Sequence, residues 1–435
     1  MERFVAKNPQ NLFRHGVRNI VCDRYEGVVR HKKREFLKEG ITLKHKSKRP
    51  KTILTLEGPV TFSRAVYVPA DKESAELLLN KYGMKTVVPL DMALGVSNLP
   101  FKISVAMMLD IARRAINAHS YEELQSSYLK DWHITISDDQ IRMVTNYLGK
   151  LVYESDCLKR QEALEHHKKG TRKQGAKSGI LYIEMDGAMF NTRLQENGST
   201  WKENKLGLVF SSKNISSFKT AKGNDYHKIL SREYISYVGS ADIFKEHLYA
   251  VALRNGLEEH EKIIVLSDGA AWIKGFLTDF CQCLDAIQIL DYTHIKENIY
   301  KFANTFIRGK NAKIKWAESL KELVKNGKVQ EAIKMAEPYK DCKKPGIPNI
   351  HSYLVNNRDC INYPEYVKNN YFIGSGAIES GNRSTMQERL KLPGMRWDVQ
   401  TAQYVLALKM KYDSGLWDTL VVPLVYKHLG LAMPY

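Results

Sequence analysis

The spacing of hydrophobic and polar residues changes along the chain and predicts different elements in turn. Apolar and polar residues alternate on both sides of Glu57-Gly58 within Thr52–Val68, which predicts a β-hairpin. From Ser104 onward the spacing is helical. The predicted helices span Ile103–Ala118, Tyr121–Lys130, Asp138–Lys150 and Tyr153–His167.

The second and third of these helices predict a helix-turn-helix. Residues 131–137 separate them, and Ser137 is a good N-cap ahead of two aspartates that favour the positive end of the helix dipole. A recognition helix would offer donors to DNA bases or phosphates from its exposed side. The candidates here are Gln140, Arg142, Thr145 and Asn146. Because helix pairs are common in any helical domain, an ordinary helical domain is the alternative.

After a basic, glycine-punctuated stretch at residues 168–179, strands and helices alternate. The predicted strands span Ile180–Met185, Lys205–Ser211, Glu233–Val238, Lys262–Ser267 and Ala286–Leu290, with helices over Ile243–Asn255 and Ala270–Phe280. This β-β-β-α-β-α-β order predicts an α/β fold of the RNase H-like kind. Helical spacing over Ala312–Lys325 and Val329–Glu337 predicts an all-α insertion, and a helix from about Ser375 to Lys391 resumes the unit.

The predicted organisation therefore has five parts. A basic β-rich segment (1–92) and a helical helix-turn-helix-like domain with linker (93–178) precede the catalytic domain. That RNase H-like domain is interrupted: residues 179–311 form its first part, 312–370 the helical insertion, and 371–435 the closing helix and tail.

Charge points to a polyanion as the partner. The formal net charge is +18, and the first 60 residues hold 15 lysines and arginines against 6 acidic residues, which is half of the whole excess. Nucleic acid is the simplest partner for such a chain. The basic run Lys44–Lys51 is either a solvated loop or a phosphate contact. We favour contact, through Lys44, Lys46, Lys48 and Arg49.

The six cysteines form no CxxC pair and no cysteine-histidine cluster with zinc spacing, which predicts reduced thiols and no zinc site. The amino-terminal residues lack the apolar core of a signal peptide. Charged residues also interrupt every apolar stretch well before 18 residues. We therefore expect a cytoplasmic protein with no membrane partner.

Two predicted strands end in the same tripeptide, Asp-Gly-Ala, at Asp186 and at Asp268. A carboxylate at the carboxyl end of a buried strand projects into the crevice above the sheet, where two of them can hold divalent cations. A single Asp-Gly is more simply a turn or a helix cap. Two in matching contexts favour a site.

A third carboxylate is expected from the opposite wall of this crevice. Glu379 lies one turn inside the helix that follows Gly374-Ser-Gly376, and these glycines would allow close approach of the backbone. Alternatively, Glu379 is an ordinary glutamate at a helix start, stabilised by the helix dipole or by an ion pair with Arg383. Glu184 and Glu388 are other candidates for the third ligand. Mg²⁺ prefers a few carboxylates with water and substrate phosphate completing its shell.

Three blocks of sequence resemble the transposases of bacterial insertion sequences in the RNase H-like DDE superfamily, specifically the Kra-type and Lre-type groups related to Mutator-like enzymes. The resemblance covers roughly residues 90–418. The blocks are residues 185–188 with 201–210, residues 266–273 with 289–297, and residues 373–380 with 389–397.

The resemblance implies that Asp186, Asp268 and Glu379 are the catalytic, metal-binding triad. It implies that Asp291 and His294 support the active site, and that Arg389, Lys391 and Trp397 contact DNA, although Trp397 fits a core position equally well. Arg383, on the same predicted helix as Glu379, is a further candidate for DNA binding. Related chains often carry cysteine pairs before the helical region, whereas residues 64–70 here contain none. This absence agrees with the expectation of no zinc.

The implied reaction is cleavage of transposon ends and transfer of the 3′-hydroxyl strands to target DNA, supported by two Mg²⁺ or Mn²⁺ ions. Double-stranded DNA would be the partner, and a homo-oligomer would assemble on it. The alternatives are an RNase H-like nuclease or junction resolvase that joins no strands, and a domesticated DNA-binding protein that does not cut. The intact acidic residues argue against the second alternative.

Overall fold

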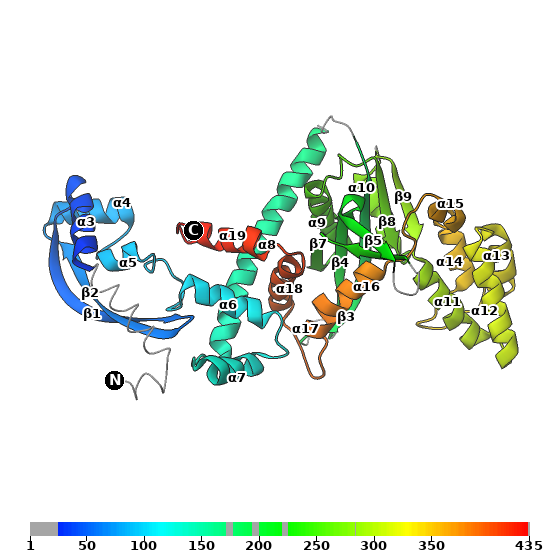
Figure 1. The fold of residues 1–435 in the computed structure, drawn as a ribbon, viewed down its shortest axis with the longest axis horizontal. Helices are drawn as coiled ribbons and strands as arrows, with labels where there is room; N and C mark the ends of the chain where they lie inside the picture. Colours follow the sequence, from blue (N-terminus) through cyan, green and yellow to red (C-terminus); the bar gives the residue numbers. More distant parts are fainter. Residues whose placement is uncertain (1–24, 171–176, 194–199, 220–224, 283, 434–435) are drawn as a thin grey trace. The chain divides into compact units, whose positions relative to one another are not determined.

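The computed structural model describes residues 25–170, 177–193, 200–219, 225–282 and 284–433 (Figure 1). The chain divides into two compact units, one formed by residues 1–151 with 417–435 and the other by residues 152–416. Half of the basic stretch predicted as a boundary, residues 171–176, and the most amino-terminal basic residues lie outside the described ranges. None of the helices in the described ranges has both the length and the apolar character needed to cross a membrane.

The first unit contains the predicted hairpin. Strand β1 (Leu43–Thr55) pairs antiparallel with β2 (Gly58–Pro69), and Thr55 lies opposite Gly58 at the turn, which confirms the prediction. The hairpin is longer than its alternating pattern indicated, because the basic run Lys44–Lys51 forms part of β1 instead of a loop. Phe36, Tyr67 and Leu78 pack together in a small core beside it.

Helices account for the rest of the first unit. They are α3 (Tyr25–Lys38), α4 (Lys72–Tyr82), α5 (Pro89–Ala93), α6 (Val105–Ala115), α7 (Tyr121–Trp132), the π-helical segment η5 (Trp417–Val421) and α19 (Val422–His428). Helix α8 (Asp138–Lys169) contributes residues to both units. Two separate helices had been predicted over α8, which was wrong. Val144, Leu148, Leu151 and Val152 are buried at continuous helical spacing, so no break falls between them.

The start of α8 corrects part of the recognition-helix prediction. Ser137 caps the helix as predicted, with its Oγ accepting from Gln140 N at 3.1 Å. The Gln140 side chain accepts in return from Ser137 N, which is a capping box. Thr145 is fully buried and donates to the Ile141 carbonyl, so its expected exposure was wrong. Arg142 is exposed but paired with Asp139, and Asn146 is half-buried.

The second unit is built on a mixed five-stranded sheet, so the chain as a whole is a mixed α/β protein. The strands are β3 (Ile180–Asn191), β4 (Trp201–Ser211), β7 (Glu233–Val238), β8 (Lys262–Ser267) and β9 (Ala286–Leu290), in the spatial order β7-β4-β3-β8-β9. Strand β3 is antiparallel to β4 and parallel to β8, and β9 continues the parallel part. The last three strands begin and end where the sequence predicted.

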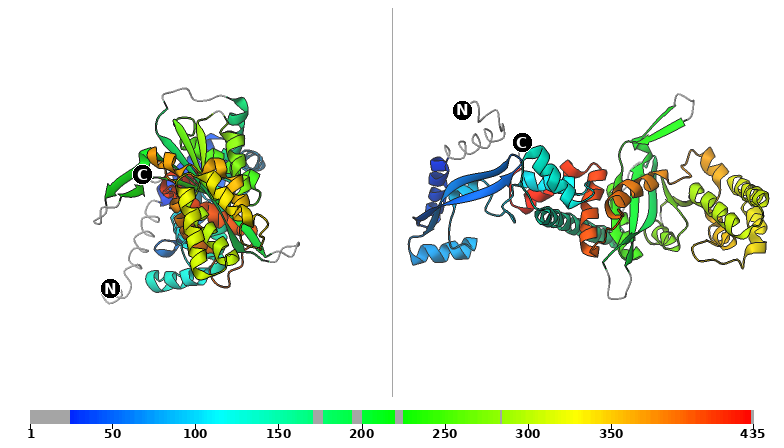
Figure 2. Two further views of the ribbon diagram at one scale, coloured as in Figure 1. Left: turned by 90° about the vertical axis from the view of Figure 1, so that its right-hand side faces the viewer. Right: turned by 90° about the horizontal axis from the view of Figure 1, so that it is seen from below.

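An additional hairpin, not predicted from the sequence, follows β4 after a short 3₁₀ turn, η1 (Ser212–Asn214). It consists of β5 (Ile215–Lys219) and β6 (Asp225–Ile229), and it projects away from the main sheet (Figure 2). Its strands carry polar and charged residues at most positions, so no apolar alternation marked them as strands.

Each face of the sheet is covered by helices. Ile183 and Val265 on one face pack against Phe244 of α9 (Ala241–Arg254) and Phe276 of α10 (Ala271–Phe280). The other face receives α16 (Gly376–Gly381), where the ring of Tyr234 packs against Gly381. Helix α18 (Val399–Asp413) lies along the free edge of β7, where the Gln403 side chain accepts from Val238 N at 2.8 Å (Figure 1). A π-helical segment, η4 (Asn382–Gln387), and α17 (Glu388–Leu390) continue α16 without a break.

Between β9 and α16 the chain forms a helical region. Its elements are α11 (Tyr292–Phe306), α12 (Lys310–Lys325), α13 (Val329–Ala336), η2 (Glu337–Tyr339), α14 (Ile350–Asn356), η3 (Arg358–Cys360) and α15 (Tyr363–Lys368). The ring of Phe302 packs against Trp316 and Tyr339, which joins α11, α12 and η2 in a core of their own. We call this region the insertion; its helices α12 and α13 confirm the two helices predicted over Ala312–Lys325 and Val329–Glu337.

Candidate active site

Asp186 lies within a strand and does not end one. The predicted turn at Asp186-Gly187 was wrong: β3 stays paired with β4 through Asn191, and Asp186 lies opposite Leu206. Its Oδ2 accepts from Asn382 Nδ2 at 2.5 Å, and its Oδ1 accepts from Gly187 N at 2.7 Å. Because alternate residues of a strand share a face, Asp186 lies on the side opposite the core residue Met185, the face that carries α16.

Asp268 follows the last residue of β8, as predicted. Gly269 adopts φ +85°, the left-handed region that favours glycine, and turns the chain there. The Asp268 Oδ1 accepts from Ala270 N at 2.9 Å, and its backbone carbonyl accepts from the Tyr353 hydroxyl at 2.6 Å. This second contact ties the end of β8 to α14 in the insertion.

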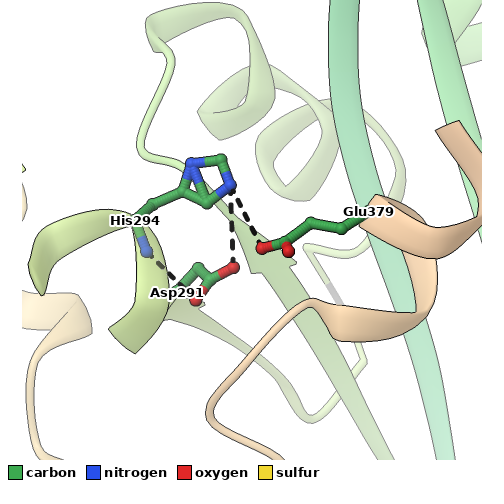
Figure 3. Close-up of side chains that lie close together, drawn as sticks. All are labelled: Asp291, His294 and Glu379. Atoms are coloured by element: carbon green, nitrogen blue, oxygen red, sulfur yellow. Dashed lines mark hydrogen bonds and ion pairs between the residues drawn. The ribbon is translucent and has the colours of Figure 1, made fainter. Parts of the chain in front are cut away.

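Glu379 reaches toward the strand ends from α16. Its side chain is 42% exposed, and its Oε1 lies 3.5 Å from Nε2 of His294 at the start of α11 (Figure 3). Burial raises the pKa of Glu379, and the nearby charges of Asp291 and Asp186 raise it further, partly offset by His294.

The register of the sheet sets Asp186 beside Asp268, because β3 and β8 stay paired up to Met185 and Ser267, and Asn382 joins the helical run that carries Glu379 to Asp186. Burial raises the pKa of Asp186, the hydrogen bonds from Asn382 and Gly187 oppose this rise, and the charge of Asp268 adds to it. The charge of Asp186 in turn raises the pKa of Glu379. Carboxylates interact in this way only when they are near one another in a poorly solvated setting. Bound cations would offset the repulsion between such carboxylates.

Asp291 is fully buried and holds two segments together. Its Oδ1 caps α11 by accepting from Thr293 N at 2.5 Å and His294 N at 3.4 Å, while its Oδ2 accepts from the backbone N–H of Ser375 at 3.1 Å and from the Ser375 hydroxyl. A carboxylate has about four lone-pair sites, and these four donors occupy them. Asp291 thus positions α11 against the start of α16.

Asp291, His294 and Glu379 are the cluster drawn in Figure 3. Within the described part of the chain, these are the residues whose potential ligand atoms all lie within 4.8 Å of one another. His294 Nε2 is 4.0 Å from Asp291 Oδ2. Because the hydrogen bonds of Asp291 are already complete, a cation bound there would have to displace Ser375 or the helix cap.

The two alternative third ligands occupy different surroundings. Glu184 is fully buried, its Oε2 accepts from Ile378 N at 2.8 Å, and burial raises its pKa to about 8. A neutral, buried acid is a poor cation ligand. Glu388 is exposed further along the helix, and its charge acts on Asp413 in α18. These surroundings favour Glu379 over Glu184 and Glu388 as the third carboxylate.

Apart from Gln140, Arg142 and Asn146 at the start of α8, the residues predicted to bind DNA fall into two groups. Those whose side chains are exposed are Lys44, Lys46, Lys48 and Arg49 on β1, Arg383 in η4, and Lys391. Arg389 is only 3% exposed, and its guanidinium lies 4.7 Å from the ring centre of the buried Trp397. The prediction that Arg389 and Trp397 contact DNA is corrected, since packing the cation on the ring occupies both side chains.

The sequence reasoning missed residues that support the acids. Asn382 lies three positions after Glu379, a spacing that places both on one helix face and that could have indicated its role. Tyr353 and Asn357 act from the insertion: Asn357 Nδ2 donates to the Tyr353 carbonyl at 2.9 Å, and the Tyr353 hydroxyl donates to Asp268. Nothing in the local pattern marks a contact across 85 residues.

Comparison with known families gives one assignment. Residues 4–419 match the model of an uncharacterised protein family, UPF0236, and the chain belongs to that family. None of the curated proteins compared with the chain matches it.

Proposed function

We propose that this protein is a DNA transposase whose RNase H-like domain cleaves and joins DNA strands by metal-dependent phosphoryl transfer. The observation that carries the proposal is the placement of Asp186, Asp268 and Glu379 on adjoining elements: β3 and β8 stay paired up to the residues before the two aspartates, and Asn382 joins the helical run of Glu379 to Asp186. The three acids come from a central strand, from the adjacent parallel strand, and from a helix that follows a long insertion.

The strand arrangement supports the RNase H-like part of the proposal. Numbered within the sheet, the spatial order β7-β4-β3-β8-β9 is 3-2-1-4-5, with an antiparallel meander followed by two parallel strands. Ligands of open α/β sheets bind beyond the carboxyl ends of the strands, where the order reverses. Asp186 and Asp268 lie on the neighbouring strands β3 and β8 at this point.

The donor set fits divalent cations of the magnesium type. It consists of carboxylate oxygens that are half-buried or exposed, so water and phosphate can complete a shell. Asp186, Asp268 and Glu379 would hold the ions. When bound, two such ions activate the attacking hydroxyl and stabilise the leaving oxygen of an in-line displacement.

The protein's own residues perform the positioning. Asn382 holds the Asp186 carboxylate through Oδ2, and Tyr353 fixes the backbone at Asp268. Asp291 joins α11 to the start of α16, so that His294 and Glu379 face each other. Such preorganisation lets the carboxylates bind without rearrangement during the reaction.

The amino-terminal unit supports DNA as the substrate. The cationic side chains Lys44, Lys46, Lys48 and Arg49 are exposed on β1 of a hairpin with its own small core. Because neutralised phosphates release counterions, we expect the whole chain to bind duplex DNA with an affinity that falls steeply with salt.

The decisive experiment uses the full chain and a plasmid that carries its gene with the natural flanking DNA. With Mn²⁺ or Mg²⁺ we expect nicked intermediates and covalently joined products, and neither with EDTA or with Glu379→Gln. Cleavage without joining would favour a nuclease. DNA binding without metal-dependent cleavage would favour a DNA-binding protein that does not cut, and would overturn the proposal.

A further inference from the structure

A cavity of about 450 Å³ lies beside the carboxylate cluster, between the connection from β6 to β7 and the segment that enters α16. Its lining includes Lys228 and Arg232 on one side and Phe372, Gly374 and Gly376 on the other. Volumes of a few hundred cubic ångströms are typical of sites for small ligands. The size therefore suits one nucleotide unit and excludes a duplex.

The walls offer both a flat apolar surface and positive charge. Phe372 is half-buried, with its ring centre 5.0 Å from Tyr182 and 5.4 Å from His227. Lys228 is exposed at the end of β6, and the Arg232 guanidinium lies 5.5 Å from the ring centre of Tyr234. Aromatic rings beside cations are the combination that recognises a nucleobase with its phosphate.

The floor of the cavity carries a buried polar group. Glu184 lines the cavity with a side chain that is 1% exposed, and its Oε2 is taken by Ile378 N. Among the described residues, no hydrogen bond reaches Oε1. Oε1 can therefore bond a polar group that enters the cavity.

The residues that line the cavity lie close in sequence to two of the carboxylates. Glu184 precedes Asp186 by two residues on the same strand face, a rise of roughly 7 Å. Gly376 and Ala377 line the cavity and precede Glu379 on α16. A strand that places a phosphate at the carboxylates can therefore place an adjacent nucleotide in the cavity.

We propose that this cavity receives one unpaired nucleotide of the bound DNA, with the base against Phe372, a phosphate at Lys228 and Arg232, and the base edge at Glu184. The inference rests on the proposed function, because it takes DNA as the substrate. An unpaired base is required because a base within a duplex has both faces covered by its neighbours.

The test measures binding by the full chain in EDTA, so that no cleavage occurs. The probes are a short blunt duplex and the same duplex with a single unpaired 2-aminopurine at its 3′ or 5′ end. Since stacking of one base contributes roughly 1–3 kcal/mol, we expect about tenfold tighter binding of one overhang probe, with quenched 2-aminopurine fluorescence.

Two variants remove the site by different means. Phe372→Leu removes the stacking ring, and Gly376→Leu fills the cavity, since a Cβ at Gly376 would meet no atom within 4 Å. Phe218→Leu is the control, because Phe218 is 49% exposed on β5 and does not line the cavity. We expect each cavity variant to bind the blunt probe and the preferred overhang probe with affinities within about twofold of each other. The control should keep the wild-type preference for the overhang.

The outcomes separate this inference from the proposed function. If the wild-type chain binds blunt duplex but prefers neither overhang, or if Gly376→Leu keeps the preference, the nucleotide site is refuted while DNA binding stands. If the wild-type chain binds no DNA at all, the proposed function fails and the site fails with it.

Discussion

The two Asp-Gly-Ala segments at residues 186–188 and 268–270 have the same sequence but different structures. At the first, β3 continues for several residues past the aspartate, and Gly187 has an ordinary extended conformation. At the second, β8 ends at Ser267 and Gly269 turns the chain with φ +85°. Both aspartates nevertheless serve the same cluster.

The difference follows from the neighbouring strands. Strand β3 has a long antiparallel partner, β4, whose hydrogen bonds extend beyond Asp186 as far as the pair Asn191 and Trp201. Strand β8 lies between two parallel strands, and its pairing with both stops at Ser267. A dipeptide that favours a turn forms one only where the ladder ends. Local turn propensity is therefore weaker than pairing with a neighbouring strand.

The largest expected effect tests whether the two aspartates are equal in function despite this difference. Asp186→Asn and Asp268→Asn should each lower metal-dependent DNA cleavage by about 10³-fold, because each removes a charge worth several kcal/mol to the reaction. Asp285→Asn, an exposed acid near the opposite end of β8, is the control and should cleave normally. Retention of activity by either variant would show that the two segments differ in function as well.

The next effect concerns the support that only Asp186 receives from a side chain. Asn382→Ala removes the hydrogen bond to Asp186 Oδ2 and should raise the Mn²⁺ concentration for half-maximal cleavage by about 10-fold or more, as loss of a partner behind a metal ligand usually does. Ser384→Ala on the same helix is the matched control. An unchanged metal requirement would remove Asn382 from the site.

The two glycines should respond differently to the same substitution. Gly269→Ala should lower the stability of the fold by about 2 kcal/mol, because φ is positive and a Cβ would lie 2.9 Å from the buried Asn357. Gly187→Ala should change stability by less than about 0.5 kcal/mol, because the nearest atom is the carboxylate end of the exposed Glu203 side chain, which can move. Thermal unfolding of the two variants measures this, and equal losses would contradict the structural difference.

The sequence predicted much of the architecture around these segments. The strand limits of β7, β8 and β9 were correct because each is a short apolar run with clear ends. The continuation of β3 and the buried pairing of Arg389 with Trp397 were missed, since both depend on partners distant in sequence. The β5–β6 hairpin was missed because its residues do not alternate in polarity.

For the candidate site, the sequence suggested three acids and two supporting residues, Asp291 and His294, whereas Asn382 and Tyr353 were missed. Asp186, Asp268 and Glu379 were assigned from strand ends, a helix start and a family resemblance. The four hydrogen bonds of Asp291 could not be foreseen, because two of them come from Ser375, 84 residues away. Close approach at Gly376 was expected, yet a Cβ there would meet open space.

The smallest effect concerns the support that only Asp268 receives from the insertion. Tyr353→Phe removes the hydroxyl that donates to the Asp268 carbonyl and should cost roughly 1 kcal/mol of stability. Chemical denaturation measures the change. Tyr300→Phe, whose hydroxyl bonds the half-exposed Glu318, should cost less. A larger loss for Tyr300→Phe would show that the insertion does not brace the end of β8.

The most direct test of the metal site is the anomalous scattering of Mn²⁺ in crystals of the full chain bound to duplex DNA. We expect manganese peaks between the carboxylates of Asp186, Asp268 and Glu379, and the loss of these peaks in Asp186→Asn. A single peak held by His294 Nε2, Asp291 and Glu379, with none beside Asp186 and Asp268 at saturating Mn²⁺, would contradict this expectation.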